Sequence, residues 1–307
     1  MSMEKQFESI GDGLLVRAPA KINLSLLVAG KRPDGYHELE TIMAKINWYD
    51  EILIEPRREK GIELICKGPY EVPEGEDNLV YKAAKLILET GYQRIGESGK
   101  QGAGVRITLV KNIPAGTGLG SGSSDAAGTL MGINRFLKLG LSKKKLSVLA
   151  TQLGSDVAFF LGGPMSFCTG KGEKVQKLPK SEFRVFLVVP DVSVSTKRVY
   201  ENYRHDTAKY EPFHRAISGY IEKKRIDLVC GLCANMLQES CFELNAKLRE
   251  LKKEVERAGI GQLCLSGSGS SMYCIIDKGN EEKIVTYQNK LARDFCCKSM
   301  ILNSNSW

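Results

Sequence analysis

One stretch of the chain indicates chemistry by its composition alone, the glycine-rich segment from Pro114 to Gly128. Glycine lets a backbone approach a ligand closely, and an apolar helical pattern follows from Ala126 to Phe136. Backbone N–H groups at a helix start lack intrahelical partners and lie at the positive end of the helix dipole. The segment therefore predicts a phosphate-binding site. Its candidate contacts are Pro114, Gly116, Gly118, Leu119, Gly120, Ser121, Gly122, Ser123 and Ser124.

A predicted strand over residues 105–110 leads into the glycine-rich segment, and Lys111 follows it directly. Strand, glycine loop and helix is the order that a nucleotide phosphate site requires, and Lys111 is expected to line the nucleotide pocket. The segment lacks both the Gly-Lys-Ser or Gly-Lys-Thr of a P-loop and the acidic residue of a dinucleotide fingerprint. The alternative is a glycine-rich loop that lies in solvent without a ligand.

Two residues of opposite charge stand where predicted elements break. Lys21 lies between apolar strand patterns at 14–18 and 22–27, and Asp156 lies just before the apolar run 157–161. A carboxylate can accept a proton, and an ammonium can offset phosphate charge. Each residue also has a plainer interpretation, because Asp156 could cap a helix and Lys21 could be a surface lysine.

Tyr36 and His37 stand side by side after a turn that begins at Arg32, and a predicted strand at 39–46 follows. A tyrosine ring can stack on a flat ligand and an imidazole can form hydrogen bonds with it, although Tyr36 could instead pack at a strand edge. A second small-residue loop, 266–271, joins predicted strands at 262–265 and 272–276. That loop could be a simple hairpin.

The composition is that of an ordinary globular protein. The 307 residues are enough for two domains, which we expect at 1–165 and 166–307. No apolar stretch reaches the length of a membrane span, so we expect a cytoplasmic protein. The net charge of +8 comes from dispersed lysines without an aromatic motif, which indicates no nucleic-acid partner. The nine cysteines are expected to be reduced and to hold no metal, although Cys230 and Cys233 form one Cys-x-x-Cys.

Three separated motifs, at 19–24, 114–124 and 265–269, together resemble the GHMP kinase superfamily. Within it, the segments 32–37 and 153–157 resemble the branch that uses ATP to phosphorylate the C2 hydroxyl of 4-diphosphocytidyl-2-C-methyl-D-erythritol in non-mevalonate isoprenoid biosynthesis. The resemblance implies an α+β fold of two domains. An N-terminal domain would bind ATP, and the active site would lie between it and a C-terminal domain of sheet and helices.

The resemblance also implies a role for individual residues. Asp156 would accept the hydroxyl proton, and Lys21 would orient Asp156 and offset charge on the transferring group. The expected substrate contacts are Asn23, Tyr36, His37, Thr196, Tyr200, Gly267 and Ser268, with the cytosine gripped by Tyr36 and His37 and covered on its opposite face by Tyr200. The implied small molecules are ATP, Mg²⁺ and the cytidyl diphosphate substrate, bound by a monomer or a weak homodimer.

Two other functions remain possible at this point. One is another GHMP kinase, of the mevalonate-pathway or homoserine type, against which the sequence from Asp34 to His37 argues. The other is a non-catalytic nucleotide-binding or RNA-binding protein, because the chain is basic. The presence of both Lys21 and Asp156 argues against the latter.

Overall fold

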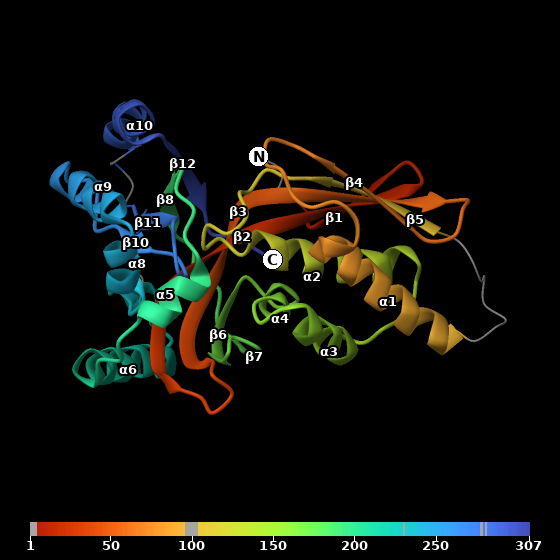
Figure 1. The fold of residues 1–307 in the computed structure, drawn as a ribbon, viewed down its shortest axis with the longest axis horizontal. Helices are drawn as coiled ribbons and strands as arrows, with labels where there is room; N and C mark the ends of the chain where they lie inside the picture. Colours follow the sequence, from red (N-terminus) through yellow and green to blue (C-terminus); the bar gives the residue numbers. More distant parts are fainter. Residues whose placement is uncertain (1–4, 96–103, 230, 277–278, 280) are drawn as a thin grey trace.

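The computed structural model describes residues 5–95, 104–229, 231–276, 279 and 281–307. Its first sheet has the strand order β1-β2-β3-β5-β4 (Figure 1). Three further strands extend it: β6 pairs with β3, β7 pairs with β6, and β9 pairs with β2. The strands are β1 (Phe7–Ile10), β2 (Gly13–Lys31), β3 (His37–Arg57), β4 (Ile62–Lys67), β5 (Gly104–Val110), β6 (Met165–Gly170), β7 (Lys174–Lys177) and β9 (Ala234–Asn235).

The two longest strands, β2 and β3, run antiparallel through both halves of the molecule (Figure 1). Their pairing shifts register between Pro19 and Ala20 and again between Asn23 and Ser25. Such irregularities change the direction in which side chains point. The predicted break at Lys21 is therefore a pair of irregularities within one continuous strand.

Four helices and a short 3₁₀ turn belong to the first half, and its apolar core lies between these helices and the sheet. They are η1 (Gly75–Asp77), α1 (Leu79–Ile95), α2 (Ser121–Phe136), α3 (Lys143–Leu153) and α4 (Val157–Phe160). Ser142 accepts a hydrogen bond from the backbone N–H of Lys145 and so caps the start of α3. Helix α2 begins at Ser121, five residues before its apolar run, so Ser121 to Ser124 form its first turn and not a loop.

The second half contains a four-stranded sheet of order β10-β11-β8-β12, covered by helices (Figure 1). Its strands are β8 (Arg184–Pro190), β10 (Cys264–Leu265), β11 (Met272–Ile275) and β12 (Cys297–Asn303). The helices are α5 (Thr196–Asn202), α6 (Thr207–Glu222), α7 (Ile226–Val229), α8 (Gln238–Leu244), α9 (Ala246–Arg257) and α10 (Glu281–Phe295). A third apolar cluster joins the halves through buried side chains of β2, β3, β8 and β11.

The strands β6 and β7 belong to the first sheet through their pairing with β3. The chain therefore stays in the first sheet as far as Lys177 and enters the second sheet at Arg184. By sheet membership the division falls between those residues, later than the expected one between 165 and 166. Among the described residues, no helix has both the length and the apolar character needed to cross a bilayer.

Candidate active site

The three predicted motifs meet through backbone and side-chain hydrogen bonds. The backbone N–H of Lys21 donates to the carbonyl of Leu119 at 2.9 Å. Ser266 Oγ donates to the Gly118 carbonyl at 2.8 Å and accepts from the Asn23 backbone N–H at 3.3 Å. The loop 266–271 is a hairpin between β10 and β11, as the plainer interpretation has it, and it also contacts the glycine loop.

Gly118 is the position at which the glycine loop requires glycine most strictly. Its φ is +82°, and a Cβ at this position would lie only 2.1 Å from the Ser266 carbonyl oxygen. Real Cβ atoms do not approach oxygen so closely, so the two loops can meet only where one of them has no side chain. The glycines of this loop thus allow it to contact the loop 266–271, in addition to allowing a ligand to approach the backbone.

Helix α2 starts directly at the end of the glycine loop, with Gly120 as its N-cap in a left-handed conformation. No side-chain hydrogen bond caps this helix start. The first backbone N–H groups of an α-helix have no intrahelical acceptor, and the helix dipole makes this end positive. The arrangement suits an anion such as a phosphate, as predicted from the sequence.

Lys21 and Asp156 come together although they are far apart in the chain. Lys21 Nζ lies 3.7 Å from Asp156 Oδ2 and donates to Asn23 Oδ1 at 2.6 Å. The Lys21 side chain is 4% exposed and that of Asp156 is 35% exposed. Burial lowers the pKa of Lys21, and the nearby Asp156 opposes that shift. The pair therefore has a buried ammonium and a solvent-accessible carboxylate.

The helix-capping interpretation of Asp156 is not what the structure shows. Asp156 occupies the N-cap position of α4, but its side chain forms no capping hydrogen bond. Its φ and ψ of −80° and −12° are helical, whereas a capping residue usually has an extended conformation. The carboxylate is instead directed to Lys21, which leaves it available for chemistry.

Lys111 does not lie where the sequence suggested. Its side chain is 1% exposed, and its ammonium forms ion pairs with Asp50 and with Asp125 Oδ2, the latter at 2.6 Å. It also donates to Ser121 Oγ at 2.7 Å, in the first turn of α2. The expectation that Lys111 lines the nucleotide pocket is corrected by this burial, because the ammonium supports the glycine loop and helix start from within the core.

Asp50 fixes the entry to the glycine loop. Its Oδ1 accepts the backbone N–H groups of Asn112 at 2.6 Å and Ile113 at 2.8 Å, while Oδ2 pairs with Lys111. Burial raises the pKa of Asp125 to about 8, and Lys111 opposes that shift while Asp50 adds to it. Two carboxyl groups thus share one buried ammonium.

Tyr36 and His37 have different surroundings. The Tyr36 ring is 58% exposed and lies outside the strand, with Lys171 Nζ 4.4 Å from its centre, so it does not pack at a strand edge. The His37 ring stacks on Tyr200 with centres 5.2 Å apart. Burial lowers the pKa of His37, and the charges of Lys31 and His205 lower it further. Tyr200 therefore faces His37, and its expected place on the opposite face of the cytosine stays a prediction.

The remaining predicted contacts lie on the third loop and its neighbour. Thr196 Oγ1 and Ser268 Oγ are hydrogen-bonded at 2.8 Å, which joins the start of α5 to the loop. A Cβ on Gly267 would lie 3.4 Å from Lys21 Nζ. Asn23 lies between Lys21 and Thr41, to which its side-chain amide donates at 2.8 Å. Asn23 and Gly267 therefore lie next to the Lys21 ammonium, and Ser268 follows Gly267 on the same loop.

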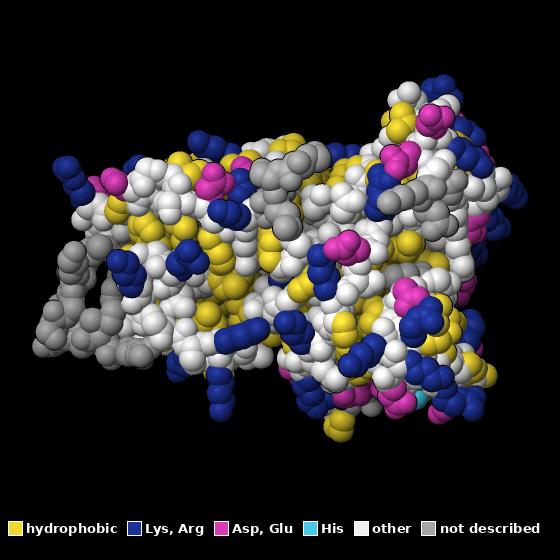
Figure 2. Space-filling view, turned by 180° about the vertical axis from the view of Figure 1, so that it is seen from behind, with side chains coloured by type: hydrophobic (Ala, Val, Ile, Leu, Met, Phe, Trp, Pro, Cys, Tyr) yellow, Lys and Arg dark blue, Asp and Glu magenta, His cyan; other side chains and the backbone are white. Residues whose placement is uncertain are grey.

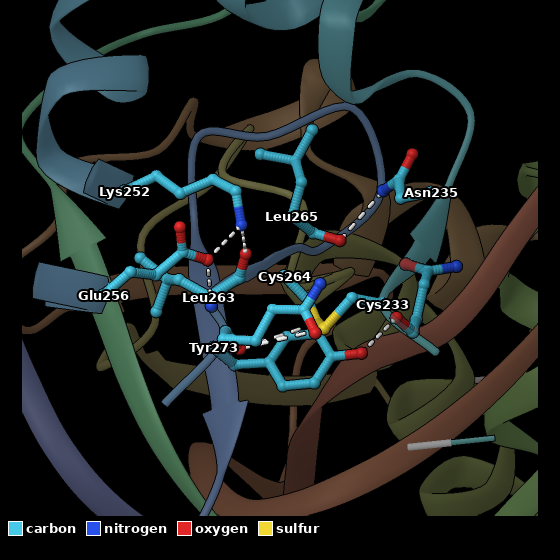
Figure 3. Close-up of a disulfide and its surroundings, with 10 residues drawn as sticks. Cys233, Asn235, Lys252, Glu256, Leu263, Cys264, Leu265 and Tyr273 are labelled. Carbon is cyan, nitrogen blue, oxygen red and sulfur yellow. Dashed lines mark hydrogen bonds and ion pairs between the residues drawn. A yellow bond between two sulfur atoms is a disulfide. The ribbon is translucent and has the colours of Figure 1, made fainter. Parts of the chain in front are cut away.

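A disulfide between Cys233 and Cys264 lies beside the third loop (Figure 3). The expectation that all cysteines are reduced is wrong for this pair, while Cys230 of the Cys-x-x-Cys lies outside the described residues. Next to it, Asn235 Nδ2 donates to the carbonyls of Leu265 and Gly267, each at 2.8 Å. The short strand β9 and its disulfide thus hold the base of the loop.

Comparison with known proteins identifies the family. Residues 78–164 match the GHMP kinases N terminal domain, and residues 219–291 match the GHMP kinases C terminal model. The chain is 38% identical over 287 residues to the 4-diphosphocytidyl-2-C-methyl-D-erythritol kinase of Geobacillus sp. (strain WCH70), covering 92% of this chain and 94% of that one. The chain belongs to the GHMP kinase family.

Further GHMP kinases support the assignment. The enzyme of the same name from Macrococcus caseolyticus is 38% identical over 93% of this chain and 96% of its own length. A crystal structure of 4-(cytidine 5'-diphospho)-2C-methyl-D-erythritol kinase superimposes with a TM-score of 0.74 at 30% identity, covering 95% of this chain and 100% of that one. A homoserine kinase from Cytophaga hutchinsonii has a TM-score of 0.73 at 21% identity, covering 99% and 98%, which shows the shared fold.

The GHMP kinase assignment confirms the predicted α+β fold of two domains and an ATP-dependent small-molecule kinase. On the face shown in Figure 2, basic side chains are scattered over both halves with acidic ones among them, and they form no continuous stripe. This distribution matches the dispersed lysines of the sequence. Among the described residues, no group of three or more His, Cys, Asp or Glu is arranged to hold a metal ion.

Sequence reasoning about this GHMP kinase missed two buried residues, Asp50 and Lys45. Lys45 Nζ donates to the carbonyls of Phe160 at 3.1 Å and Gly162 at 3.0 Å, at the end of α4. Burial lowers the pKa of Lys45 to about 7, and the charge of Lys143 acts in the same direction. For both Asp50 and Lys45, the signal in the sequence was a charged residue within an apolar strand pattern. That signal indicates a buried charge but does not show which residue pairs with it.

Proposed function

We propose that this chain transfers the γ-phosphoryl group of ATP to the C2 hydroxyl of 4-diphosphocytidyl-2-C-methyl-D-erythritol, giving the 2-phosphate and ADP. The substrate is named by the relatives at 37–38% identity that match over most of the chain. The observation that carries the proposal is the Lys21–Asp156 pair beside the contact between the glycine loop and the third loop. In this proposal the transferring group lies next to that pair.

Phosphoryl transfer requires positioned reactants and stabilised phosphate charge more than a strong base. In our proposal, the backbone of residues 114–124 and the start of α2 hold the triphosphate, as their positive φ values and helix dipole favour. Lys21 offsets the charge that develops on the transferring group. Lys111 contributes by supporting the loop from its buried position.

Asp156 acts as the proton acceptor in this mechanism. The C2 oxygen forms its bond to the γ-phosphorus as the bond between that phosphorus and the ADP oxygen breaks. The hydroxyl proton passes to Asp156, whose accessible carboxylate is free of any capping hydrogen bond. Lys21 holds the carboxylate in place through their contact at 3.7 Å, and Asn23 in turn holds Lys21.

Mg²⁺ is the ion that this proposal pairs with ATP. Two oxygen atoms near the start of α2, Ser124 Oγ and Asp125 Oδ1, are buried without a hydrogen-bond partner in the described structure. Hydroxyl and carboxyl oxygens are ligands that Mg²⁺ accepts, so these residues fit the ion. Asp125 Oδ2 is already engaged by Lys111, which makes Ser124 the better candidate. When bound, the ion would neutralise phosphate charge.

The cytidyl end of the substrate is proposed to lie against Tyr36 and His37. Tyr36 presents an exposed ring for stacking, with the Lys171 ammonium nearby. His37 has a lowered pKa, so its neutral ring offers one donor and one acceptor to the edge of a base. Thr196, Ser268 and Gly267 are proposed to contact the polyol or the diphosphate, with Tyr200 behind His37.

The experiment is ATP turnover by the purified protein with a panel of alcohols, followed by coupled detection of ADP. We expect turnover with the cytidyl methylerythritol compound and none above background with mevalonate or homoserine. Phosphorus NMR of the product is expected to show a new phosphomonoester. Turnover of mevalonate or homoserine in preference to the cytidyl compound would reject the proposed substrate, and an absence of turnover with every alcohol would reject the kinase mechanism.

A further inference from the structure

All three histidines of the chain lie in one run of ring contacts. The rings of Tyr203 and His37 form a T-shaped contact with centres 5.8 Å apart. Tyr203 and His205 are in contact at 6.3 Å between centres, and the Tyr203 hydroxyl lies 3.3 Å from His205 Nδ1. We call the residues His37, Tyr203, His205, Tyr210 and His214 the ring chain.

The other end of the ring chain, at Tyr210 and His214, contacts β3, the same strand that carries His37. Tyr210 contacts His205 at 6.1 Å and stacks on His214 at 5.3 Å. His214 Nδ1 lies 2.7 Å from Glu40 Oε2, and the Tyr210 hydroxyl donates to Glu40 Oε1 at 3.2 Å. Glu40 and His37 both belong to β3. The ring chain therefore leaves β3 at His37, crosses the segment between α5 and α6, and returns to β3.

The His37 ring is held by other rings on two sides. Tyr200 covers its face at 5.2 Å, and Tyr203 meets it edge-on at an interplanar angle of 86°. Within the described part of the chain, no side-chain hydrogen bond to the His37 imidazole is present, so both ring nitrogens are available to a ligand. Face and edge contacts of this kind favour particular ring orientations.

The orientation of this imidazole matters because hydrogen bonds weaken steeply when donor and acceptor are misaligned. If the imidazole can rotate, its donor and acceptor nitrogens can exchange positions. The ring then distinguishes one base from another poorly. Tyr203 is 9% exposed and is packed in the C-terminal core, so its edge is a fixed support. The His205 contact adds a polar restraint on the Tyr203 hydroxyl.

We propose that Tyr203 and His205 are positioning residues that set the orientation of His37 for recognition of the substrate's pyrimidine edge. This inference rests on the proposed function, because it assigns the base-reading role to His37. Neither residue touches the reacting atoms. Their effect falls on binding of the base and on discrimination between cytosine, which presents an amino donor, and uracil, which presents a carbonyl acceptor.

Tyr203→Leu removes the supporting edge, and Tyr203→Phe keeps the edge but removes the hydroxyl contact to His205. For Tyr203→Leu we expect the KM for the cytidyl substrate to rise about tenfold, while kcat and the KM for ATP stay within about twofold. The preference for the cytidyl substrate over its uridyl analogue should fall by a similar factor. Tyr203→Phe should give a smaller rise, of about threefold. Tyr287→Leu is the matched control, a partly buried tyrosine of α10 that packs against the same apolar cluster and donates to Glu254, but takes no part in the ring contacts described above.

A second measurement needs no substrate. Proton and nitrogen NMR of the three imidazoles, assigned with His205→Asn and His214→Asn, reports the surroundings of His37 directly. We expect the His37 ring signals to move in Tyr203→Leu, because a neighbouring ring is removed, and to stay unchanged in Tyr287→Leu. Unchanged His37 signals, or an unchanged KM and base preference in folded Tyr203→Leu, would overturn the positioning role. A Tyr203→Phe variant with the wild-type KM would remove His205 from it.

The two hypotheses fail in different ways. Wild-type protein that does not phosphorylate the cytidyl compound contradicts the proposed function, whatever the NMR result. Wild-type protein that turns this compound over, beside a Tyr203→Leu variant with unchanged base preference, contradicts only the ring-chain inference. If Tyr203→Leu does not fold, Tyr203→Phe and His205→Asn still test the polar restraint on Tyr203, since phenylalanine keeps the buried ring and His205 is exposed.

Discussion

The ammonium of Lys21 lies 3.7 Å from the carboxylate of Asp156, and the two residues come from opposite ends of the first domain. Lys21 is on β2, where register shifts flank it, and Asp156 stands directly before α4. Long-range packing therefore determines whether these two groups can act together.

Asp156→Asn and Lys21→Met are expected to lower kcat by about 10²- to 10⁴-fold, the usual contribution of a positioned proton acceptor or charge. Both variants should fold and bind ATP, because Asp156 is solvent-accessible and methionine keeps the buried bulk of Lys21 beside Gly120. Steady-state kinetics and a nucleotide-binding measurement check this. Asp227→Asn, which removes an exposed acid paired with Arg225, is the control. Turnover near the wild-type value in either site variant would exclude that residue from catalysis.

Gly118→Ala is expected to damage the protein far more than Gly116→Ala. Both glycines have positive φ, +82° and +71°, so each substitution has a backbone strain of about 1–2 kcal/mol. Only at Gly118 does the new Cβ meet the Ser266 carbonyl oxygen, whereas at Gly116 nothing lies within 4 Å. We expect a larger loss of thermal stability and a higher KM for ATP for Gly118→Ala. Equal effects of the two substitutions would show that contact between the loops is unimportant.

Asp125→Asn is expected to change how stability depends on pH. The folded pKa of Asp125 is about 8 and its ordinary value is 3.8, so between these pH values the folded chain keeps a proton that the unfolded chain releases. Stability contributed by this group is therefore present at low pH and is lost as pH rises through about 8. Asparagine cannot ionise, so the variant should become more stable relative to wild type between pH 4 and pH 8.

Denaturant unfolding across that pH range measures the difference, with Asp50→Asn as the comparison. Asp50 accepts two backbone N–H groups and pairs with a buried ammonium, so its substitution should cost about 3–5 kcal/mol. A constant stability difference between Asp125→Asn and wild type over this range would contradict the assigned pKa.

Lys45→Met is expected to lower kcat about tenfold with little change in either KM. Its ammonium joins two carbonyls at the end of α4, and Asp156 stands at the other end of that four-residue helix. Loosening the helix end should displace the carboxylate from the reacting oxygen, and small displacements are costly in catalysis. Lys144→Met, on the exposed face of α3, is the matched control. A kcat equal to that of the control would assign Lys45 a purely structural role.

Local patterns in the sequence predicted several secondary-structure elements and the family of this protein. The alternation before Lys111, the glycine segment and the apolar run after it predicted strand, loop and helix in the right order. The three separated motifs identified the family, because each consists of residue types that a particular local backbone conformation requires. Such signals depend on neighbours within a few positions in the chain.

Tertiary structure alone decided where the charged side chains point and which element each segment joins. Lys111 is buried between Asp50 and Asp125, and Asp156 contacts Lys21 and does not cap a helix. Strands β6 and β7 belong to the first sheet, and Tyr200 stacks on His37. These outcomes depend on which distant residue supplies a partner for a buried charge or a strand edge. A single sequence shows that a partner is needed, and only the folded chain determines which one is close enough to serve.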